Sequence, residues 1–389
     1  MPIYLDHAAT SPMPPFVVEA YVSALSVVGN PSSIHSQGQN AKRMLEEARE
    51  HVAASLGADS VEVTFTGGGT EAVNLGIKGL WWSRATPERN RILVPEGEHH
   101  ATIDAIDWLE KHDGAIIDWI PIDGLGRIDL AYLESALGDD VALVTAIWAN
   151  NEVGTIQPVD AIAALAAQHG VPVHIDAIAA YGYLPIDFHA LCVATLSVSA
   201  HKIGGPVGTG ALLIARTATV TPLMHGGNQQ RARSGTQDAA GAVAFGVAAA
   251  AIDTAAHAPA LRSLRDRLVG GIRSAVPSAV YRGDPDDRLP GNAHFTFPGC
   301  EGDSLLFLLD VAGFSVSTGS ACQAGVPEAS HVLLSMGLTE SDARGALRFT
   351  LGPDTTTDEV DALVAALPAA VERASNAGLS DRLTTLGRS

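Results

Sequence analysis

The sequence predicts an α/β protein in which a large domain contains a mainly parallel sheet and a smaller domain mixes helices and strands. Over the first two thirds of the chain, short runs rich in β-branched residues alternate with stretches of helical periodicity. This alternation is typical of a parallel sheet that helices cover on both faces. After about residue 253 the alternation stops and long amphipathic stretches appear. We therefore expect a large domain over 15–252 and a small domain made of 1–14 and 253–389.

The individual elements follow from the same patterns. In the stretch 39–57, helical spacing places five apolar residues on one face: Met44, Leu45, Ala48, Val52 and Leu56. Further helices are expected at 71–83, 161–170, 261–276 and 356–374, and a buried, Ala-rich helix at 239–252. Strands are expected at 61–65, 91–95, 115–122, 141–149, 171–177, 194–200, 211–215, 291–297 and 314–320.

Composition excludes several classes of function. The formal net charge of −19 argues against direct binding to nucleic acid or to an anionic membrane. Cys192, Cys300 and Cys322 are an odd set without close spacing, which predicts reduced thiols and neither a disulfide framework nor a metal site. The first residues resemble no signal peptide, and the apolar stretch 239–252 is too short to span a bilayer. We expect a cytoplasmic protein.

Residues with chemical potential follow several of the predicted strands. In parallel sheets ligands bind beyond the carboxyl ends of the strands. The first strand is followed by GGGTEAVN, which is either a phosphate cradle at a helix start or a plain turn. Asp176 ends another strand, where a carboxylate pairs with a protonated ring nitrogen or caps the next segment. Lys202, beside His201, follows a third strand and is either a functional amine or a surface lysine.

One chemistry accounts for these residues together. A lysine that loses its proton forms a Schiff base with an aldehyde cofactor. An aspartate that holds the pyridinium proton makes the cofactor ring an electron sink. A glycine–threonine helix start holds the phosphate, and His99 or His100, each otherwise a helix-start residue, covers the ring face. The combination indicates pyridoxal 5'-phosphate bound to Lys202.

Long ordered motifs run through nearly the whole chain. They are YLDHAAT at 4–10, GNPSSIHSQG at 29–38, FTGGGTEAVNLGIKG at 65–79, GEHHAT at 97–102, WANNEVGTIQP at 148–158, HIDA at 174–177, SAHKIGGPVGTGAL at 199–212, MHGGNQQRARSGTQD at 224–238, STGSAC at 317–322 and LRFTLG at 347–352. In these motifs the sequence resembles the cysteine desulfurases of the iron–sulfur cluster and nitrogen-fixation type, which are class V aminotransferases. The resemblance implies the type I pyridoxal-phosphate fold of aspartate aminotransferase.

The resemblance also implies roles around the cofactor. Lys202 is expected to hold the cofactor covalently, Asp176 to pair with its pyridine nitrogen, and His99 to stack on its ring and assist proton transfer. The residues implied for the phosphate are Gly69, Thr70, Ser199 and His201. Thr236, in RSGT, is implied to reach the phosphate of the other subunit's cofactor, which makes the protein a homodimer.

Substrate roles follow from the same resemblance. Asn151 is expected beside substrate and cofactor, and Arg348 is expected to bind the substrate carboxylate, which suits a planar guanidinium. Cys322, in a segment of small residues, is implied to be the nucleophile that takes sulfur from L-cysteine, leaving L-alanine and an enzyme persulfide. The spacing after STGSAC fits members with a long mobile cysteine loop. Cys192 and Cys300 are interpreted as packing or turn cysteines.

One position departs from the family pattern. Ala179 stands where the family usually has a glutamine that hydrogen-bonds the cofactor's ring oxygen. Losing one such bond costs about 0.5–1.5 kcal/mol. The chemistry is expected to survive, because Asp176 and Lys202 are present, whereas the absorption or the rate is expected to change.

Other functions share much of this pattern. A selenocysteine lyase or a class V aminotransferase would use the same Lys202, Asp176 and Arg348, and Cys322 favours the desulfurase over the aminotransferase. A protein that only docks sulfur acceptors is a further alternative, against which the retained covalent-chemistry residues argue. The sulfur acceptor is expected to be a protein, either an iron–sulfur scaffold or a thiolation protein. The sequence names neither that acceptor nor the preference between cysteine and selenocysteine.

Overall fold

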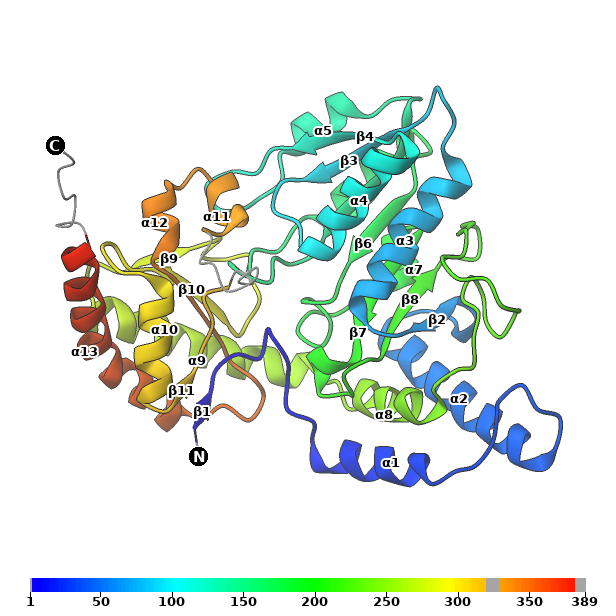
Figure 1. Ribbon diagram of the computed structural model, residues 1–389, viewed down its shortest axis with the longest axis horizontal. Helices are drawn as coiled ribbons and strands as arrows, with labels where there is room; N and C mark the ends of the chain where they lie inside the picture. The colour runs from blue at the N-terminus through cyan, green and yellow to red at the C-terminus, as the bar shows by residue number, and fades with distance from the viewer. Residues whose placement is uncertain (1, 320–328, 382–389) are drawn as a thin grey trace, which may run out of the picture.

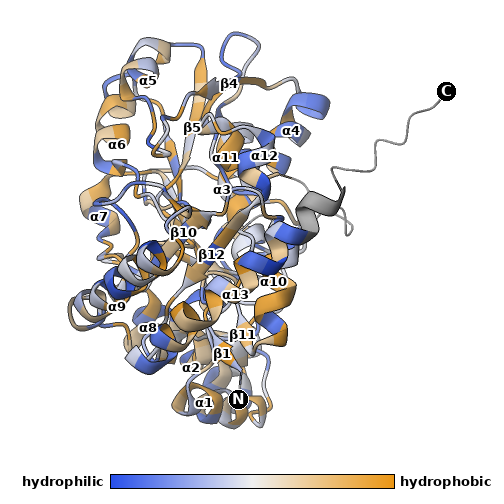
Figure 2. Ribbon diagram, turned by 90° about the vertical axis from the view of Figure 1, so that its left-hand side faces the viewer, coloured by the Kyte–Doolittle hydropathy of each residue, from blue (hydrophilic) through white to orange (hydrophobic). Residues whose placement is uncertain are grey.

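The computed structural model describes residues 2–319 and 329–381 and consists of two units, each built on its own sheet (Figure 1). A seven-stranded sheet lies in the larger unit and a three-stranded sheet in the smaller one. The central strands of both sheets are buried. Figure 2 shows one of them, β5 (Val141–Ile147), largely in the hydrophobic colour. The α/β class and the mainly parallel sheet predicted from the sequence are confirmed.

The large sheet places most of its strands parallel to one another. Its order is β2 (Val63–Thr66), β8 (Gly210–Ile214), β7 (Thr195–Ser199), β6 (Val173–Asp176), β5, β3 (Arg91–Pro95) and β4 (Ile116–Ile120). Only β8 runs antiparallel to its neighbours β2 and β7. The remaining strands are therefore parallel, and their carboxyl ends meet at one edge.

Helices cover both faces of this sheet, as the alternation of elements predicted. Leu143 of β5 packs towards α3 (Gly69–Arg84) and α4 (His100–Asp113). Its neighbour Val144 packs in the opposite core, formed with the other helices. These are α2 (Ser36–Ser55), α5 (Leu130–Ala136), α6 (Val159–Gln168), α7 (Phe188–Leu191) and α8 (Ala239–Ala250). Both faces are buried, which explains the continuous apolar strand runs.

The smaller unit is an antiparallel sheet packed on helices. Its strands are β9 (Val280–Arg282), β10 (Asn292–Thr296) and β12 (Ala346–Thr350), with β10 in the centre. The covering helices are α9 (Thr254–Ala275), α10 (Gly302–Val311) and α13 (Thr357–Asp381), and two short helices, α11 (His331–Ser335) and α12 (Glu340–Arg344), precede β12. Phe295 and Phe349 face this helical core, so the side chains that alternate with them face the larger unit.

The N-terminal segment joins the smaller unit. β1 (Ile3–Tyr4) pairs with β11 (Phe314–Ser315), Leu5 is buried in the core of that unit, and Asp6 bridges to Thr350. The next element, α1 (Pro15–Leu25), packs instead on α8. The chain thus passes from one unit to the other between Asp6 and α1. The domain limits predicted above stay a prediction.

Several element limits differ from those predicted. The expected strand at 314–320 is only β11, followed by an isolated bridge from Ser317 to Arg348. The expected helix at 261–276 begins earlier, because Asp253 caps it by accepting a hydrogen bond from the amide of Ala256 at 2.9 Å. Within the described residues, no single helix has both the length and the apolar composition needed to span a membrane; α8 and α9 together do so only as a pair bent by 74°.

Candidate active site

A cavity of about 270 Å³ opens at the carboxyl ends of the parallel strands. Most of the residues predicted for the cofactor line it: Gly69, Thr70, His99, Asn151, Asp176, Ser199, His201 and Lys202. They come from segments far apart in the sequence, and the topology of the sheet brings them together. The residues named from the sequence therefore lie together at the strand ends, and their roles stay predictions.

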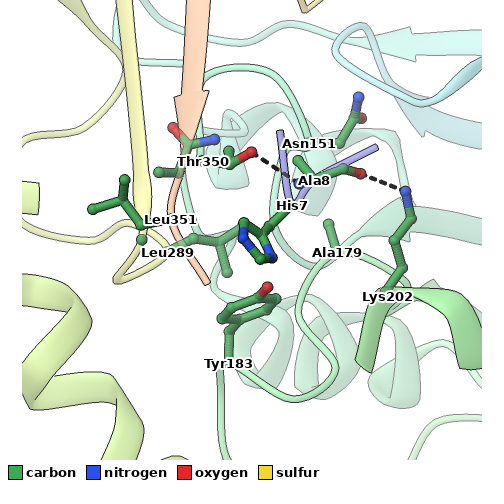
Figure 3. Close-up of a pocket in the computed structure, with 11 residues that line it drawn as sticks. His7, Ala8, Asn151, Ala179, Tyr183, Lys202, Leu289, Thr350 and Leu351 are labelled. Atoms are coloured by element: carbon green, nitrogen blue, oxygen red, sulfur yellow. Dashed lines mark hydrogen bonds between the residues drawn. The ribbon is translucent and has the colours of Figure 1, made fainter. Parts of the chain in front are cut away.

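Lys202 lies in a single 3-10 turn, η2 (Ala200–Ile203), directly after β7. Its Nζ donates hydrogen bonds to the carbonyl oxygen of Ala8 (Figure 3) and, at 3.0 Å, to that of Ala9. Burial, together with the positive charge of Arg348, lowers the pKa of the Lys202 amine to about 8. A substantial fraction of the amine is then neutral near physiological pH, and the neutral amine is the form that attacks an aldehyde.

Asp176 is the last residue of β6 and is 2% exposed. Its Oδ1 accepts a hydrogen bond from the amide of Ile178 at 2.9 Å. Burial raises the pKa of Asp176 to about 6. A protonated ring nitrogen placed against this carboxyl would favour its charged form, since an opposite charge lowers a carboxyl pKa. Asp176 therefore offers the partner that a pyridine nitrogen needs.

His99 begins α4 and opens into the cavity. Its Nδ1 accepts a hydrogen bond from the amide of Ala101 at 3.0 Å. Burial, with the charge of Lys202 next in size, lowers the pKa of His99 to about 4. The ring is therefore neutral, and its proton is on Nε2 because Nδ1 is an acceptor.

Glu98, directly before His99, is a buried group that the sequence reasoning did not single out. It is fully buried, and its Oε1 accepts a hydrogen bond from the amide of Ile147 at 2.6 Å. Burial, with a smaller contribution from the Asp176 carboxyl, raises the pKa of Glu98 to about 8. The only sequence signal was an acidic residue in GEHHAT, and nothing in the sequence showed its burial.

The start of α3 forms a cradle of the kind that binds phosphate. Gly68 has a φ of 129°, which favours glycine, and a Cβ on Gly69 would lie 2.4 Å from Cδ1 of Ile178, whose side chain would have to shift. The Oγ of Ser199 is buried beside this turn and has no hydrogen-bond partner among the described residues. An unpartnered buried hydroxyl next to a helix N-terminus is suited to an anion. Thr70 and His201 complete the wall.

Arg348 projects from β12 and is 4% exposed. Its Nη2 donates to Oδ1 of Asp6 at 2.8 Å, and its Nη1 donates to the carbonyl oxygen of Asn151 at 2.8 Å. Its Nε has no partner among the described residues. Arg348 thus contacts the backbone of a cavity residue, although it is not itself among the lining residues. Its role at the substrate carboxylate stays a prediction.

A second hollow adjoins the cavity on the side of the N-terminal segment (Figure 3). His7, Tyr183 and Ala179 line it, and it shares Asn151 and Lys202 with the cavity. Ala179 borders both spaces. Its methyl group offers no hydrogen bond at the position where the family has an amide.

The remaining residues named from the sequence are Cys322, Thr236, Cys300 and Cys192. Cys322 falls outside the described residues. Thr236 is exposed and does not line the cavity of its own chain. Cys300 is buried, and burial raises the pKa of its thiol, whereas Cys192 is exposed; both are free thiols.

The donor set fits pyridoxal 5'-phosphate. Lys202 supplies an amine of lowered pKa for the aldehyde, and Asp176 supplies a buried carboxyl for the ring nitrogen. Ser199 supplies an unpartnered hydroxyl beside the glycine turn for the phosphate. His99 supplies a neutral ring for the cofactor's face. These groups share one cavity, so a single molecule can engage all of them.

Comparison with known proteins gives a consistent result. The profile of the aminotransferase class-V family matches residues 3–363. An IscS-like cysteine desulfurase of Mycobacterium tuberculosis is 51% identical over 385 residues, which cover 97% of this chain and 98% of the relative. A cysteine desulfurase of Cereibacter sphaeroides is 42% identical over 95% of this chain and 96% of the relative.

Solved structures agree with these relatives. A NifS-like protein superposes with a TM-score of 0.89 at 32% identity and covers 96% of this chain and 100% of its own. A structure described as SspA in complex with cysteine superposes with a TM-score of 0.80 at 31% identity, over 91% of this chain and 100% of its own. The profile match and the near-full-length identities show that the chain belongs to the aminotransferase class-V family of pyridoxal-phosphate enzymes, within its cysteine desulfurases.

Proposed function

We propose that this protein converts L-cysteine to L-alanine and moves the sulfur atom to Cys322 as a persulfide. The observation that carries the proposal is the Lys202 amine, with a pKa of about 8, in one cavity with the buried Asp176. The relatives named cysteine desulfurases support it, as does the similar structure solved with cysteine. The same observations disfavour a protein that only docks sulfur acceptors, because docking needs no buried amine and carboxyl.

Different residues of the chain hold the cofactor, move protons and bind the substrate. Pyridoxal 5'-phosphate, when bound, supplies an electron sink that makes the substrate's α-hydrogen acidic and its Cβ–S bond breakable. Lys202 holds the cofactor and, once its amine is free and neutral, moves the proton at the substrate's α-carbon. His99 would cover the ring of the bound cofactor, and its Nε2 would carry a proton, because Nδ1 accepts the amide hydrogen bond of Ala101. Arg348 holds the substrate carboxylate with its planar guanidinium.

Sulfur transfer is the task of Cys322. Its thiolate attacks the substrate sulfur and forms an S–S bond, while the Cβ–S bond breaks. The electron pair of that bond remains with the substrate carbon, which takes up a proton to give alanine. The enzyme is left with a persulfide on Cys322, so no external oxidant is needed for this step.

The experiment compares three cysteine variants. Cys322→Ala should still bind the cofactor and respond to cysteine by a change in visible absorption, yet release almost no alanine. Cys192→Ala and Cys300→Ala are the matched controls and should keep their activity. Near-normal alanine release by Cys322→Ala would rule out the persulfide route and favour the selenocysteine lyase alternative, which selenocysteine as substrate would then test. Borohydride reduction followed by peptide mass spectrometry should find the cofactor on Lys202.

The assembly and the sulfur destination are part of the proposal. We propose a cytoplasmic homodimer that delivers sulfur to an acceptor protein, either an iron–sulfur scaffold or a thiolation protein. Exposed apolar side chains on and after α1 support the dimer, since Val22, Leu25, Val28 and Ile34 are 60%, 61%, 82% and 93% exposed. The free thiols of Cys192 and Cys300 are consistent with a reducing compartment. Transfer of labelled sulfur from Cys322 to candidate acceptors tests the destination.

A further inference from the structure

The turn at 150–155 connects the two units next to the active site. Asn150 holds it in shape, because its Oδ1 accepts hydrogen bonds from the amides of Glu152 and Val153, both at 2.9 Å. The Nδ2 of Asn150 donates to the carbonyl oxygen of Gly97 at 2.9 Å and so ties the turn to the segment before His99. The turn is therefore a fixed support in the wall of the cavity.

Glu152 of this turn bonds a residue that follows the segment carrying Cys322 and lies near a residue that precedes it. It is 4% exposed, and its Oε2 accepts a hydrogen bond from Oγ of Ser330 at 2.5 Å. On the other side of the segment, a Cβ on Gly319 would lie 3.5 Å from the same Oε2. Cys322 lies between Gly319 and Ser330 in the sequence. One carboxyl group thus lies near Gly319, which precedes Cys322, and is bonded to Ser330, which follows it.

The smaller unit contributes to the same place. His294, the neighbour of Arg348 across β10 and β12, is fully buried, and neither of its ring nitrogens has a partner among the described residues. A Cβ on Gly319 would lie 3.4 Å from its Nε2. Gly319 itself has a φ of 89°, which favours glycine. A Cβ there would be in ordinary van der Waals contact with Glu152 and His294, so Gly319 lies beside both residues.

The chain just after the Cys322 segment makes a second contact with the larger unit, through His331. His331, directly after Ser330, contacts the carbonyl oxygen of Glu98 through Nε2 at 2.8 Å, and its ring packs against His100 with 4.9 Å between centroids. The carbonyl of Asn151, next to Glu152, meanwhile holds Arg348. The turn is therefore hydrogen-bonded both to Arg348 and to Ser330, which follows the Cys322 segment.

We propose that Glu152, through its bond to Ser330, is a positioning residue for sulfur transfer to Cys322. It acts on the second half of the reaction, because its side chain holds Ser330, which follows the nucleophile's segment, and lines neither space around Lys202. This role rests on the proposed function. Displacement of a reacting group by about 1 Å can lower a rate by about 100-fold, so the loss of such an anchor should be measurable.

The test separates cysteine binding from sulfur transfer in the cofactor-loaded enzyme. Binding is followed by the change in visible absorption on adding cysteine, and transfer by mass spectrometry of the persulfide on Cys322 in a single turnover. Glu152→Ala should slow persulfide formation by about tenfold or more and change the affinity for cysteine by less than about twofold. A persulfide rate within about threefold of wild type, or an equally large loss of affinity, would overturn the proposal.

Two further variants exclude a merely structural effect. Ser330→Thr keeps the hydroxyl and should retain the wild-type rate, whereas Ser330→Ala should be as slow as Glu152→Ala. The double variant should be no slower than either single one, because both remove the same bond; additive losses would contradict a shared role. Glu62→Ala is the matched control: Glu62 is also buried, bonds His189 at 2.7 Å, and precedes β2 at the end away from Gly69.

Persulfide formation in the wild type distinguishes failure of the proposed function from failure of the positioning role of Glu152. If the wild type places no persulfide on Cys322, the proposed function falls, and the role of Glu152 falls with it. If the wild type forms the persulfide and Glu152→Ala forms it equally fast, only the positioning role is overturned.

Discussion

At Glu98 a carboxyl group is buried without an opposite charge and beside a second carboxyl, Asp176. The amide of Ile147 binds one oxygen, and Oε2 has no partner among the described residues. Holding both carboxyls ionised in this space would be unfavourable, because like charges repel strongly where water is excluded. A neutral Glu98 leaves Asp176 as the one that carries the charge facing the cofactor.

The pKa of Glu98 makes the stability of the protein depend on pH. The pKa rises on folding from 4.5 to about 8. Between these values the unfolded chain has lost the proton and the folded protein retains it, so the free energy of unfolding falls as the pH rises through this window. Glu98→Gln resembles the neutral acid and should lose less stability between about pH 5 and about pH 8 than wild type does. Denaturant unfolding at both pH values measures this, and Glu110→Gln on the exposed face of α4 is the control. An unchanged dependence would mean that Glu98 is ionised in the fold.

Ala179 gives a spectroscopic prediction. Its methyl group borders both the cavity and the adjoining hollow, so a longer side chain can reach the cofactor's ring oxygen from this position. Ala179→Gln should shift the visible absorption of the bound cofactor or the pH at which that absorption changes, and the reaction should continue. The absorption spectrum titrated with acid and base measures the shift. Identical spectra would show that another group already fills the role of the missing amide.

The sequence predicts the residues of this site unevenly. Lys202 and Asp176 were predictable because each follows or ends a strand, and the carboxyl ends of parallel strands converge, whereas Ser199 was implied only by the family resemblance. Glu98 and Glu152 were not, because their significance lies in burial and in partners distant along the chain, Ile147 and Ser330. Local pattern carries no information about such pairings.

At the scale of elements, β12 and the N-terminal segment together present Arg348. The strand fixes the backbone of Arg348, and Asp6, next to β1, holds one arm of its guanidinium at 2.8 Å. The other arm binds the carbonyl of Asn151. A lysine at this position has one ammonium group and cannot hold both partners in the same plane as a guanidinium does.

Arg348→Lys should therefore weaken cysteine binding more than it slows turnover. We expect KM for cysteine to rise by about tenfold or more, with a smaller change in kcat, since the carboxylate contact is made before and during the reaction. Steady-state alanine release measures both constants. Arg344→Lys, on the exposed α12 a few residues earlier, is the control. An unchanged KM would place the carboxylate contact on another residue.

Sequence patterns specify long elements better than short ones. The helices α2, α3 and α6 and the large-sheet strands were predictable because each has an apolar pattern long enough to be distinctive. The antiparallel direction of β8 and the shortness of β11 were not predictable. They depend on which strand is the neighbour, as with the pairing of β11 to β1.

At the scale of the whole molecule, two exposed features support the proposed homodimer: the apolar side chains on and after α1, and Thr236. The exposed apolar side chains on and after α1 have no partner surface among the described residues of a single chain. Thr236 is exposed and does not line its own cavity. The proposed homodimer, in which a second copy would cover the apolar residues and receive Thr236 at its phosphate cradle, would account for both observations.

This arrangement predicts complementation between two defective subunits. Lys202→Ala lacks the amine that holds the cofactor, and Thr236→Ala should bind the cofactor phosphate less tightly. Co-expression with two different affinity tags yields the mixed dimer. One of its sites then combines Lys202 from the Thr236→Ala subunit with Thr236 from the Lys202→Ala subunit, and the other site carries both defects. With the cofactor kept limiting, the mixed dimer should release alanine at about half the wild-type rate, since one of two sites is intact.

The parent Lys202→Ala dimer should be inactive, and the Thr236→Ala dimer should be limited by cofactor loss. An activity no higher than the mean of the two parents would show that Thr236 serves its own chain or none, and a monomer in light scattering would contradict the assembly as a whole.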